Sequence, residues 1–156
     1  MKLEDAIKQK KWESAQQKAW LELVYTSSLV NAESAAFFGN WDLSAQQYNI
    51  LRILKGSHPN QLKVADIKSR MLDRTPNMTR LIDKLLVRKY VSRNPCKIDR
   101  RKIYIGITEK GMTLIDEIQP ENDKKAAKLK ANLSEKDGLA LGKLLEKFRD
   151  SFLDHQ

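Results

Sequence analysis

The chain has 156 residues, of which 41% are hydrophobic and 31% are charged, and its formal net charge is +9. This length is enough for one domain with a buried core, alone or with an added dimerisation layer. No apolar run approaches the ~18 residues of a membrane span, and the first residues, MKLEDAIKQKKWE, lack the apolar centre of a signal peptide, so we expect a cytoplasmic protein.

The residue types that serve metal binding and catalysis are sparse. Cys96 is the one cysteine and cannot form an internal disulfide, and His58 and His155 are far apart in the sequence. No glycine-rich phosphate loop is present, and no acid cluster accompanies a nucleophile. We therefore expect no metal, no cofactor and no enzymatic activity.

The first long segment predicts a helix. Residues 8–38 carry apolar side chains at helical spacing without an internal Pro or Gly, and the pattern stops at Gly39. Ser44 and Gln47 then form a capping-box pattern, which predicts the start of a second helix that ends at Gly56.

Two shorter helices are predicted next. Residues 63–73 form the first of them, and Thr75-Pro76 supply an N-cap and a first helical residue for the second, NMTRLIDKLLVRK. The second helix begins with small polar residues and carries Arg80 outward. Two short helices joined by a tight turn are the layout of a helix-turn-helix.

A two-stranded ribbon is predicted after these helices. Residues 90–93 and 103–107 have strand patterns about a connection at 94–102, and three isoleucines of the second strand share one face. That face should pack against the helices while the basic tip remains solvated. The tip would then reach phosphates or an adjacent minor groove, as a wing does.

The last third of the chain is again helical. The pattern after Thr108 is interrupted at Pro120, which predicts a kink or break, and Ser134 predicts the N-cap of a final helix. Apolar residues then recur at four- and three-residue steps: Leu141, Leu145, Phe148 and Phe152. This seam suits partner helices, and the alternative is packing within its own chain.

The positive charge is concentrated in one part of the chain. Residues 61–110 contain 14 Lys or Arg and 5 Asp or Glu, whereas the remainder has 15 of each sign. Surplus lysine can serve solubility alone. A surplus confined to one segment favours a polyanionic partner, because clustered cations gain affinity by releasing counterions from phosphates.

The order of these elements, with TPNMTRLIDKLLVRKYVSR, the wing DRR and then IGITEKG, resembles the MarR family of winged-helix bacterial transcription regulators. The most diagnostic part is the Asp-x-Arg signature at residues 99–101, placed between two strands and before the helix start at Thr108. The resemblance covers residues 10–153.

The resemblance implies a mainly α fold with a small β wing. One MarR-like domain would span residues 1–156, with a winged helix-turn-helix DNA-binding region at 44–111 and dimerisation helices at 8–38 and 112–153. It implies a homodimeric, sequence-specific transcription regulator, a repressor that a small-molecule or chemical signal releases from a pseudo-palindromic operator in double-stranded DNA. A non-specific architectural nucleic-acid-binding protein is the alternative.

The resemblance also assigns residues to the DNA interface. Arg101 would enter the minor groove, and Asp99 would orient the wing by pairing with an arginine. Arg80 could instead be a solvated helix residue, and Met78 could belong to the core. The assigned DNA contacts are Thr75, Asn77, Met78, Thr79, Arg80 and Lys84 of the recognition helix, and Arg100, Arg101 and Lys102 of the wing.

Two features bear on the signal that would release the protein from DNA. MarR-like proteins often hold aromatic or phenolic anions near the junction of the dimer helices and the DNA domain, where we expect Trp20, Phe38, Trp41 and Tyr48; the alternative for these aromatics is ordinary core. Cys96 lies on the wing beside cations that favour its thiolate, so it could be oxidised. The alternative is an incidental exposed cysteine, because similar cysteine sensors carry the reactive thiol in the first helix.

Overall fold

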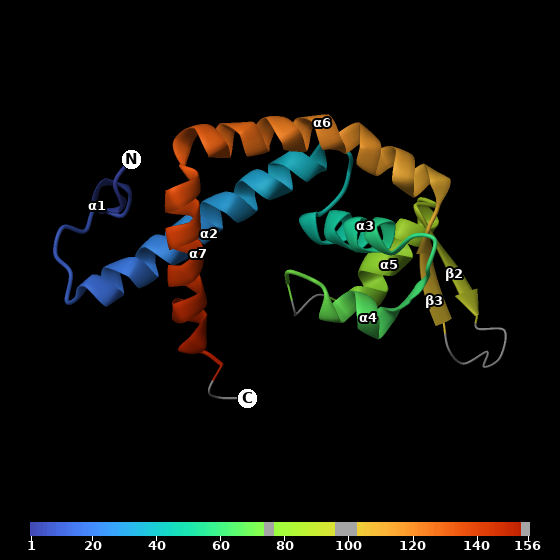
Figure 1. Cartoon of the computed structure of the whole chain (residues 1–156), viewed down its shortest axis with the longest axis horizontal. Helices are drawn as coiled ribbons and strands as arrows, with labels where there is room; N and C mark the ends of the chain where they lie inside the picture. The colour runs from blue at the N-terminus through green and yellow to red at the C-terminus, as the bar shows by residue number, and fades with distance from the viewer. Residues whose placement is uncertain (74–76, 96–102, 154–156) are drawn as a thin grey trace. The chain divides into compact units, whose positions relative to one another are not determined.

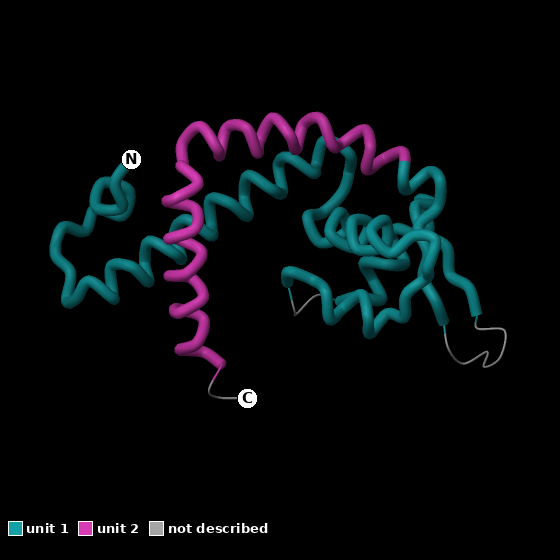
Figure 2. Tube along the Cα trace, in the orientation of Figure 1, with its two compact units in different colours: residues 1–112 teal, residues 113–156 magenta. Residues whose placement is uncertain are grey.

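The computed structural model describes residues 1–73, 77–95 and 103–153. The chain divides into two compact units, Met1–Met112 and Thr113–Gln156 (Figure 2). The first unit holds the elements from α1 through β3 and the first turn of α6, and the second holds the rest of α6 and α7 (Figure 1). The described fold is mostly helical with one small antiparallel sheet.

The first long helix begins later than the sequence pattern predicts. A short helix, α1 (Leu3–Ala6), precedes α2 (Ala15–Gly39), so the expected helical residues 8–14 lie between the two. The Ser14 side chain accepts a hydrogen bond from the Gln17 amide, and the Gln17 side chain accepts one from the Glu13 amide. These reciprocal bonds satisfy donors at the helix start and set the N-terminus of α2.

The next helix follows its sequence signal closely. In α3 (Ala45–Ser57), the Gln47 amide donates to Ser44 Oγ at 3.1 Å and the Ser44 amide donates to Gln47 Oε1 at 2.9 Å. The predicted capping box is therefore confirmed. Three side chains of α3 are fully buried in the first unit: Ile50, Leu51 and Leu54.

The helix-turn-helix is present, with two corrections. The predicted helix 63–73 is reduced at both ends to α4 (Val64–Ser69). Leu62–Lys63 form a strand, β1, that pairs with β3, and Arg70 is the C-cap, so residues 70–73 follow the helix. The second helix, α5 (Met78–Val87), is capped by Asn77, whose side chain accepts from the Arg80 amide at 3.2 Å. The prediction that Thr75 is the N-cap was wrong, because Asn77 takes that position. Thr75 itself lies outside the described residues.

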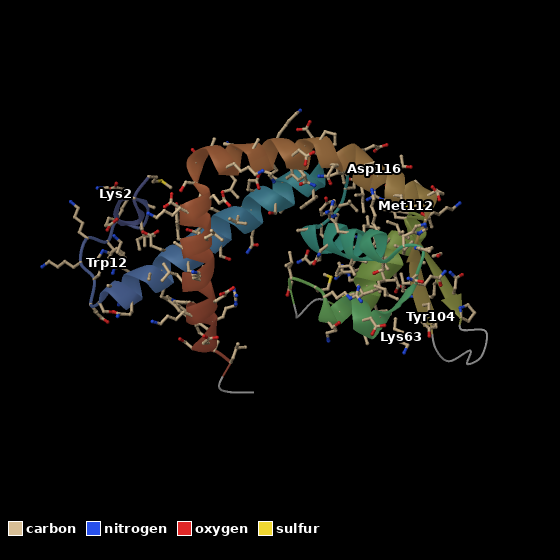
Figure 3. All side chains as sticks on the ribbon, viewed as in Figure 1. Lys2, Trp12, Lys63, Tyr104, Met112 and Asp116 are labelled. Carbon is tan, nitrogen blue, oxygen red and sulfur yellow. The ribbon has the colours of Figure 1, made fainter. Side chains whose placement is uncertain are left out.

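The wing belongs to a three-stranded sheet. Its order is β1-β3-β2, with β2 (Val91–Pro95) and β3 (Ile103–Ile107) antiparallel and Val91 opposite Ile107. Ile105 and Ile107 are buried as predicted, whereas Ile103, nearer the tip, is 42% exposed. On the opposite face, Lys63 pairs in register with Tyr104 (Figure 3).

The C-terminal helices decide one of the two alternatives at Pro120. Helix α6 (Glu109–Asn132) runs through Pro120, so the predicted break is wrong, while the predicted kink stays a prediction. The last helix, α7 (Glu135–Asp150), is capped by Ser134, whose side chain accepts from the Asp137 amide. None of the residues of α7 is buried.

Candidate nucleic-acid interface

Helix α5 has an apolar face and a polar face. Met78, Ile82 and Leu85 are buried at steps of four and three residues, and this face contacts α3. The opposite face carries Arg80 and Lys84, both exposed and four residues apart. The same periodicity that anchors the helix therefore presents two cations to the exterior.

The residues at the N-terminus of α5 that were assigned to DNA contact differ in their exposure. Thr79 is exposed, and Asn77 is exposed while its side chain caps the helix. Met78 is only 6% exposed, so its side chain belongs to the core and is not available to a ligand. Thr75 lies outside the described residues, as do the wing residues Asp99, Arg100, Arg101 and Lys102 and the cysteine Cys96.

The polar face of α5 borders an open depression of about 820 Å³. Its chemistry is mixed, since carboxylates, amides and an exposed valine accompany the cations. The lining residues are Asp42, Gln47, Asn77, Thr79, Arg80, Asp83, Lys84, Val87 and Arg88.

The cations around this depression differ in what they contact. Arg88 forms an ion pair with Asp42 at 3.1 Å, and Arg93 of β2 forms one with Asp83 of α5 at 2.8 Å. Neither Arg80 nor Lys84 forms an ion pair or a side-chain hydrogen bond with another described residue. Arg80 and Lys84 are thus the cations of α5 whose donors remain open to an external anion.

Three residues of this region carried no signal in the sequence that singled them out. Asp83 and Arg93 join the recognition helix to the wing strand, and Arg88 joins its C-terminus to the turn after α2. Sequence spacing could not identify these pairs, because Arg88 and Asp42 are 46 positions apart and meet only through the tertiary fold.

The aromatic residues assigned to an effector pocket are only partly brought together. Phe38 stacks on Tyr48 with ring centroids 4.4 Å apart, and Phe37 contacts Phe38 at 5.0 Å and Trp41 at 5.3 Å. Trp20 lies in the same helix as Phe38 but 18 residues earlier, which is roughly 27 Å along the helix axis. These contacts favour the core alternative for Phe38 and leave Trp20 outside the group.

The shifted pKa values lie elsewhere in the chain. The hydrogen bond at 2.5 Å between Lys18 and Glu4 lowers the pKa of Glu4 and raises that of Lys18.

Over the described ranges, no group of three His, Cys, Asp or Glu side chains could hold a metal ion. No helix in this part of the chain has the length and apolarity to cross a membrane.

Known proteins resemble this chain in sequence and fold. The MarR family model matches residues 43–103. The crystal structure of a MarR transcription factor from Planctomyces limnophilus is 30% identical, with a TM-score of 0.67, over 87% of this chain and 98% of that one. The MepR–DNA complex from S. aureus is 24% identical, with a TM-score of 0.73, over 83% and 94% of the two chains.

A curated relative gives the same result at lower coverage. The HTH-type transcriptional regulator PapX of Escherichia coli is 26% identical over 105 residues, which are 67% of this chain and 64% of PapX. The match thus spans less than two thirds of PapX. Because the Planctomyces regulator is matched at 30% identity over nearly its whole length, and the winged helix-turn-helix is present, the chain belongs to the MarR family, whose members are transcription regulators and not enzymes.

Proposed function

We propose that the chain is a homodimeric, sequence-specific DNA-binding repressor that a small-molecule or chemical signal releases from a pseudo-palindromic operator. The observation that carries this proposal is the outer face of α5, where Arg80 and Lys84 are exposed and engage no other described side chain. A helix held by its apolar face and open on its basic face suits insertion in a major groove. Such a protein would act in the cytoplasm.

The similar fold of the MepR–DNA complex supports the choice of DNA as partner. In this proposal Asn77, Thr79, Arg80 and Lys84 contact one half-site through α5. The wing residues Arg100, Arg101 and Lys102 contact phosphates and the neighbouring minor groove, with Asp99 orienting the wing. Met78 is omitted from the interface because it is buried.

The exposed apolar side chains of the long helices support a homodimer. On α2, Trp20, Val24, Leu29 and Val30 are between 45% and 56% exposed. On α7, Leu139, Leu141 and Leu144 are between 46% and 65% exposed. A second copy of the chain would remove this surface from water, which is the usual origin of such patches.

Two features of the chain suit a release signal. Trp41 and Tyr48 are half-buried and adjoin the end of α2, so they could line a site for a small aromatic or phenolic molecule. Cys96 on the wing is the candidate for a chemical signal. A small molecule is preferred because the chain has no second cysteine to resolve an oxidised thiol.

A salt titration on two kinds of DNA tests the proposal. Duplexes that the protein selects from a random-sequence library are compared with unselected duplexes of the same length, between low and high salt. Binding to both should weaken steeply as salt rises, and the selected duplex should keep a large advantage at every salt concentration. Equal affinities would instead identify an architectural protein without sequence preference.

A further inference from the structure

The guanidinium of Arg88 reaches from the end of α5 to the turn that follows α2. Its Nη1 donates to the carbonyl oxygens of Trp41, at 3.3 Å, and Asp42, at 2.6 Å, and its Nη2 donates to Asp42 Oδ2 at 3.1 Å. The planar, five-donor guanidinium suits such a fixed set of acceptors better than an ammonium group does. Arg88 thus connects two elements far apart in the sequence.

The turn that receives Arg88 is itself well defined. Asp42 has a left-handed backbone, with φ of 52°, and the amides of Asp42 and Leu43 donate to the carbonyls of Gly39 and Phe38 at the end of α2. The carbonyls of Trp41 and Asp42 accept from Arg88, and no backbone amide of the described residues donates to either of them. The turn therefore offers Arg88 acceptors whose positions α2 determines.

The main chain of Arg88 is fixed as well. Lys110, at the start of α6, donates from Nζ to the Arg88 carbonyl at 3.1 Å. The Arg88 guanidinium and the Lys110 ammonium lie 5.4 and 5.0 Å from the centroid of the Tyr90 ring, within cation–π range. The C-terminus of α5 is therefore tied on one side to the turn after α2 and on the other to the first turn of α6.

These directional contacts fix the orientation of α5, which the burial of its apolar face alone does not fix. Burial of Ile82 and Leu85 favours contact with α3 but is not directional, so by itself it allows the helix to turn or slide. Hydrogen bonds to three acceptors resist such motion. Arg80 and Lys84 can meet DNA groups within hydrogen-bond distance only if the helix that carries them is held in place.

We propose that Arg88 is a positioning residue for operator recognition: it fixes the C-terminus of the recognition helix α5 to the turn after α2 and makes no DNA contact of its own. The inference rests on the proposed function, since it concerns how α5 is presented to an operator. It goes beyond that function because it assigns to Arg88, a cation that lines the depression beside α5, a role within the protein. If α2 joins the two subunits, Arg88 also contributes to the separation of the two recognition helices.

The test compares Arg88→Met with a matched control, Lys89→Met. Both changes remove one positive charge and leave a side chain of similar length, and no side-chain contact of Lys89 with another described residue is lost. The probes are the selected duplex and the unselected duplex described above. Circular dichroism first establishes that each variant is folded at the assay temperature.

Arg88→Met should bind the selected duplex about tenfold more weakly, while its affinity for unselected duplex and its salt slope stay near those of wild type. Lys89→Met should retain the wild-type preference for the selected duplex. Arg88→Lys should fall between wild type and Arg88→Met, because one ammonium cannot satisfy all three acceptors. It replaces Arg88→Met in the assay if the methionine variant is unfolded.

Four results would overturn the inference. A salt slope reduced by about one, with both duplexes weakened alike, would make Arg88 a phosphate contact. A lowered melting temperature with unchanged operator preference in the folded protein would make it merely structural. A wild type that does not prefer the selected duplex would remove the proposed function and this inference with it, whereas a discriminating wild type with a fully active Arg88→Met removes the inference alone.

Discussion

At the scale of single residues, Lys89 adopts a backbone conformation that its side chain disfavours. Its φ is 62°, the left-handed region, and it directly follows the C-cap of α5. The Tyr90 amide donates to the Leu85 carbonyl and the Lys89 amide to the Leu86 carbonyl, which is the Schellman arrangement. Glycine is the residue that usually occupies this position.

Lys89→Gly should therefore raise the free energy of unfolding by about 0.5–1 kcal/mol, because removing Cβ relieves the left-handed strain. The measurement is chemical denaturation of the folded protein. Lys89→Ala is the control, since it removes the same charge but keeps Cβ. Equal stability of the two variants would contradict the explanation.

The exposed cation Lys84 allows a second test at this scale. Lys84→Ala should weaken binding to selected and unselected duplexes by the same factor and reduce the salt slope by about one, as expected for one phosphate contact. The fold should be unaffected, because the side chain has no described partner. A fluorescence binding titration at several salt concentrations gives both quantities, and an unchanged slope would exclude the contact.

At the scale of secondary-structure elements, the recognition helix is joined at its end to the wing and to α6. The Tyr90 carbonyl accepts from the Thr108 amide at 3.1 Å, and the Thr108 hydroxyl donates to the Lys89 carbonyl at 2.8 Å. Gly111 lies against the Tyr90 carbonyl: a Cβ on Gly111 would be 2.2 Å from that oxygen. The first turn of α6 thus comes so close to the backbone that follows α5 that position 111 has no room for a side chain.

Gly111→Ala should destabilise the protein by about 2 kcal/mol, because backbone at both sides of the contact must shift. Gly56→Ala is the matched control in α3, where a Cβ would have no neighbour within 4 Å. The control should stabilise by about 0.5–1 kcal/mol through the higher helix propensity of alanine. Thermal denaturation of both variants measures the difference, and a Gly111→Ala protein as stable as wild type would refute the close approach.

At the scale of the whole molecule, the surface of α7 bears on assembly. Of the predicted seam, Leu145 and Phe148 are half-buried, whereas Leu141 and Phe152 are 46% and 48% exposed. Leu144, outside the predicted seam, is 65% exposed. The exposed apolar side chains therefore extend over a wider part of α7 than the sequence spacing indicates.

Replacing Leu141 and Leu144 with aspartate should convert a dimer to monomers, because two charges would be buried at the subunit interface. The monomer should lose most of its operator affinity, since one winged helix makes too few contacts. A dimer should require half-site centres about 10 base pairs apart. Light scattering measures the mass, and the paired Leu→Met variant, which keeps the surface apolar, should remain dimeric.

Either of two observations would refute the dimer. One is a wild-type protein that scatters light as a monomer. The other is an aspartate variant that is monomeric but still binds the full operator as tightly as wild type.

How far the sequence predicted the structure depends on how local each signal was. The capping box of Ser44 and Gln47 and the cap at Ser134 were confirmed because the interacting groups are three residues apart. The N-cap of α5 was misplaced by two residues, since Thr and Asn are both favourable N-cap residues and the sequence does not distinguish Thr75 from Asn77. Strand β1 was missed because two residues carry no periodic pattern.

The sequence alone determined the winged helix-turn-helix, the basic segment and the family, because helical periodicity, caps and the Asp-x-Arg motif are properties of neighbouring residues. Only the tertiary structure decided which side chains near α5 are available to a ligand. Met78 is buried, Arg88 and Arg93 are engaged by Asp42 and Asp83, and Arg80 and Lys84 remain exposed. The reason is physical: whether a cation can bind an external anion depends on the acceptors that the fold brings near it. Some of those acceptors lie tens of residues away in the chain.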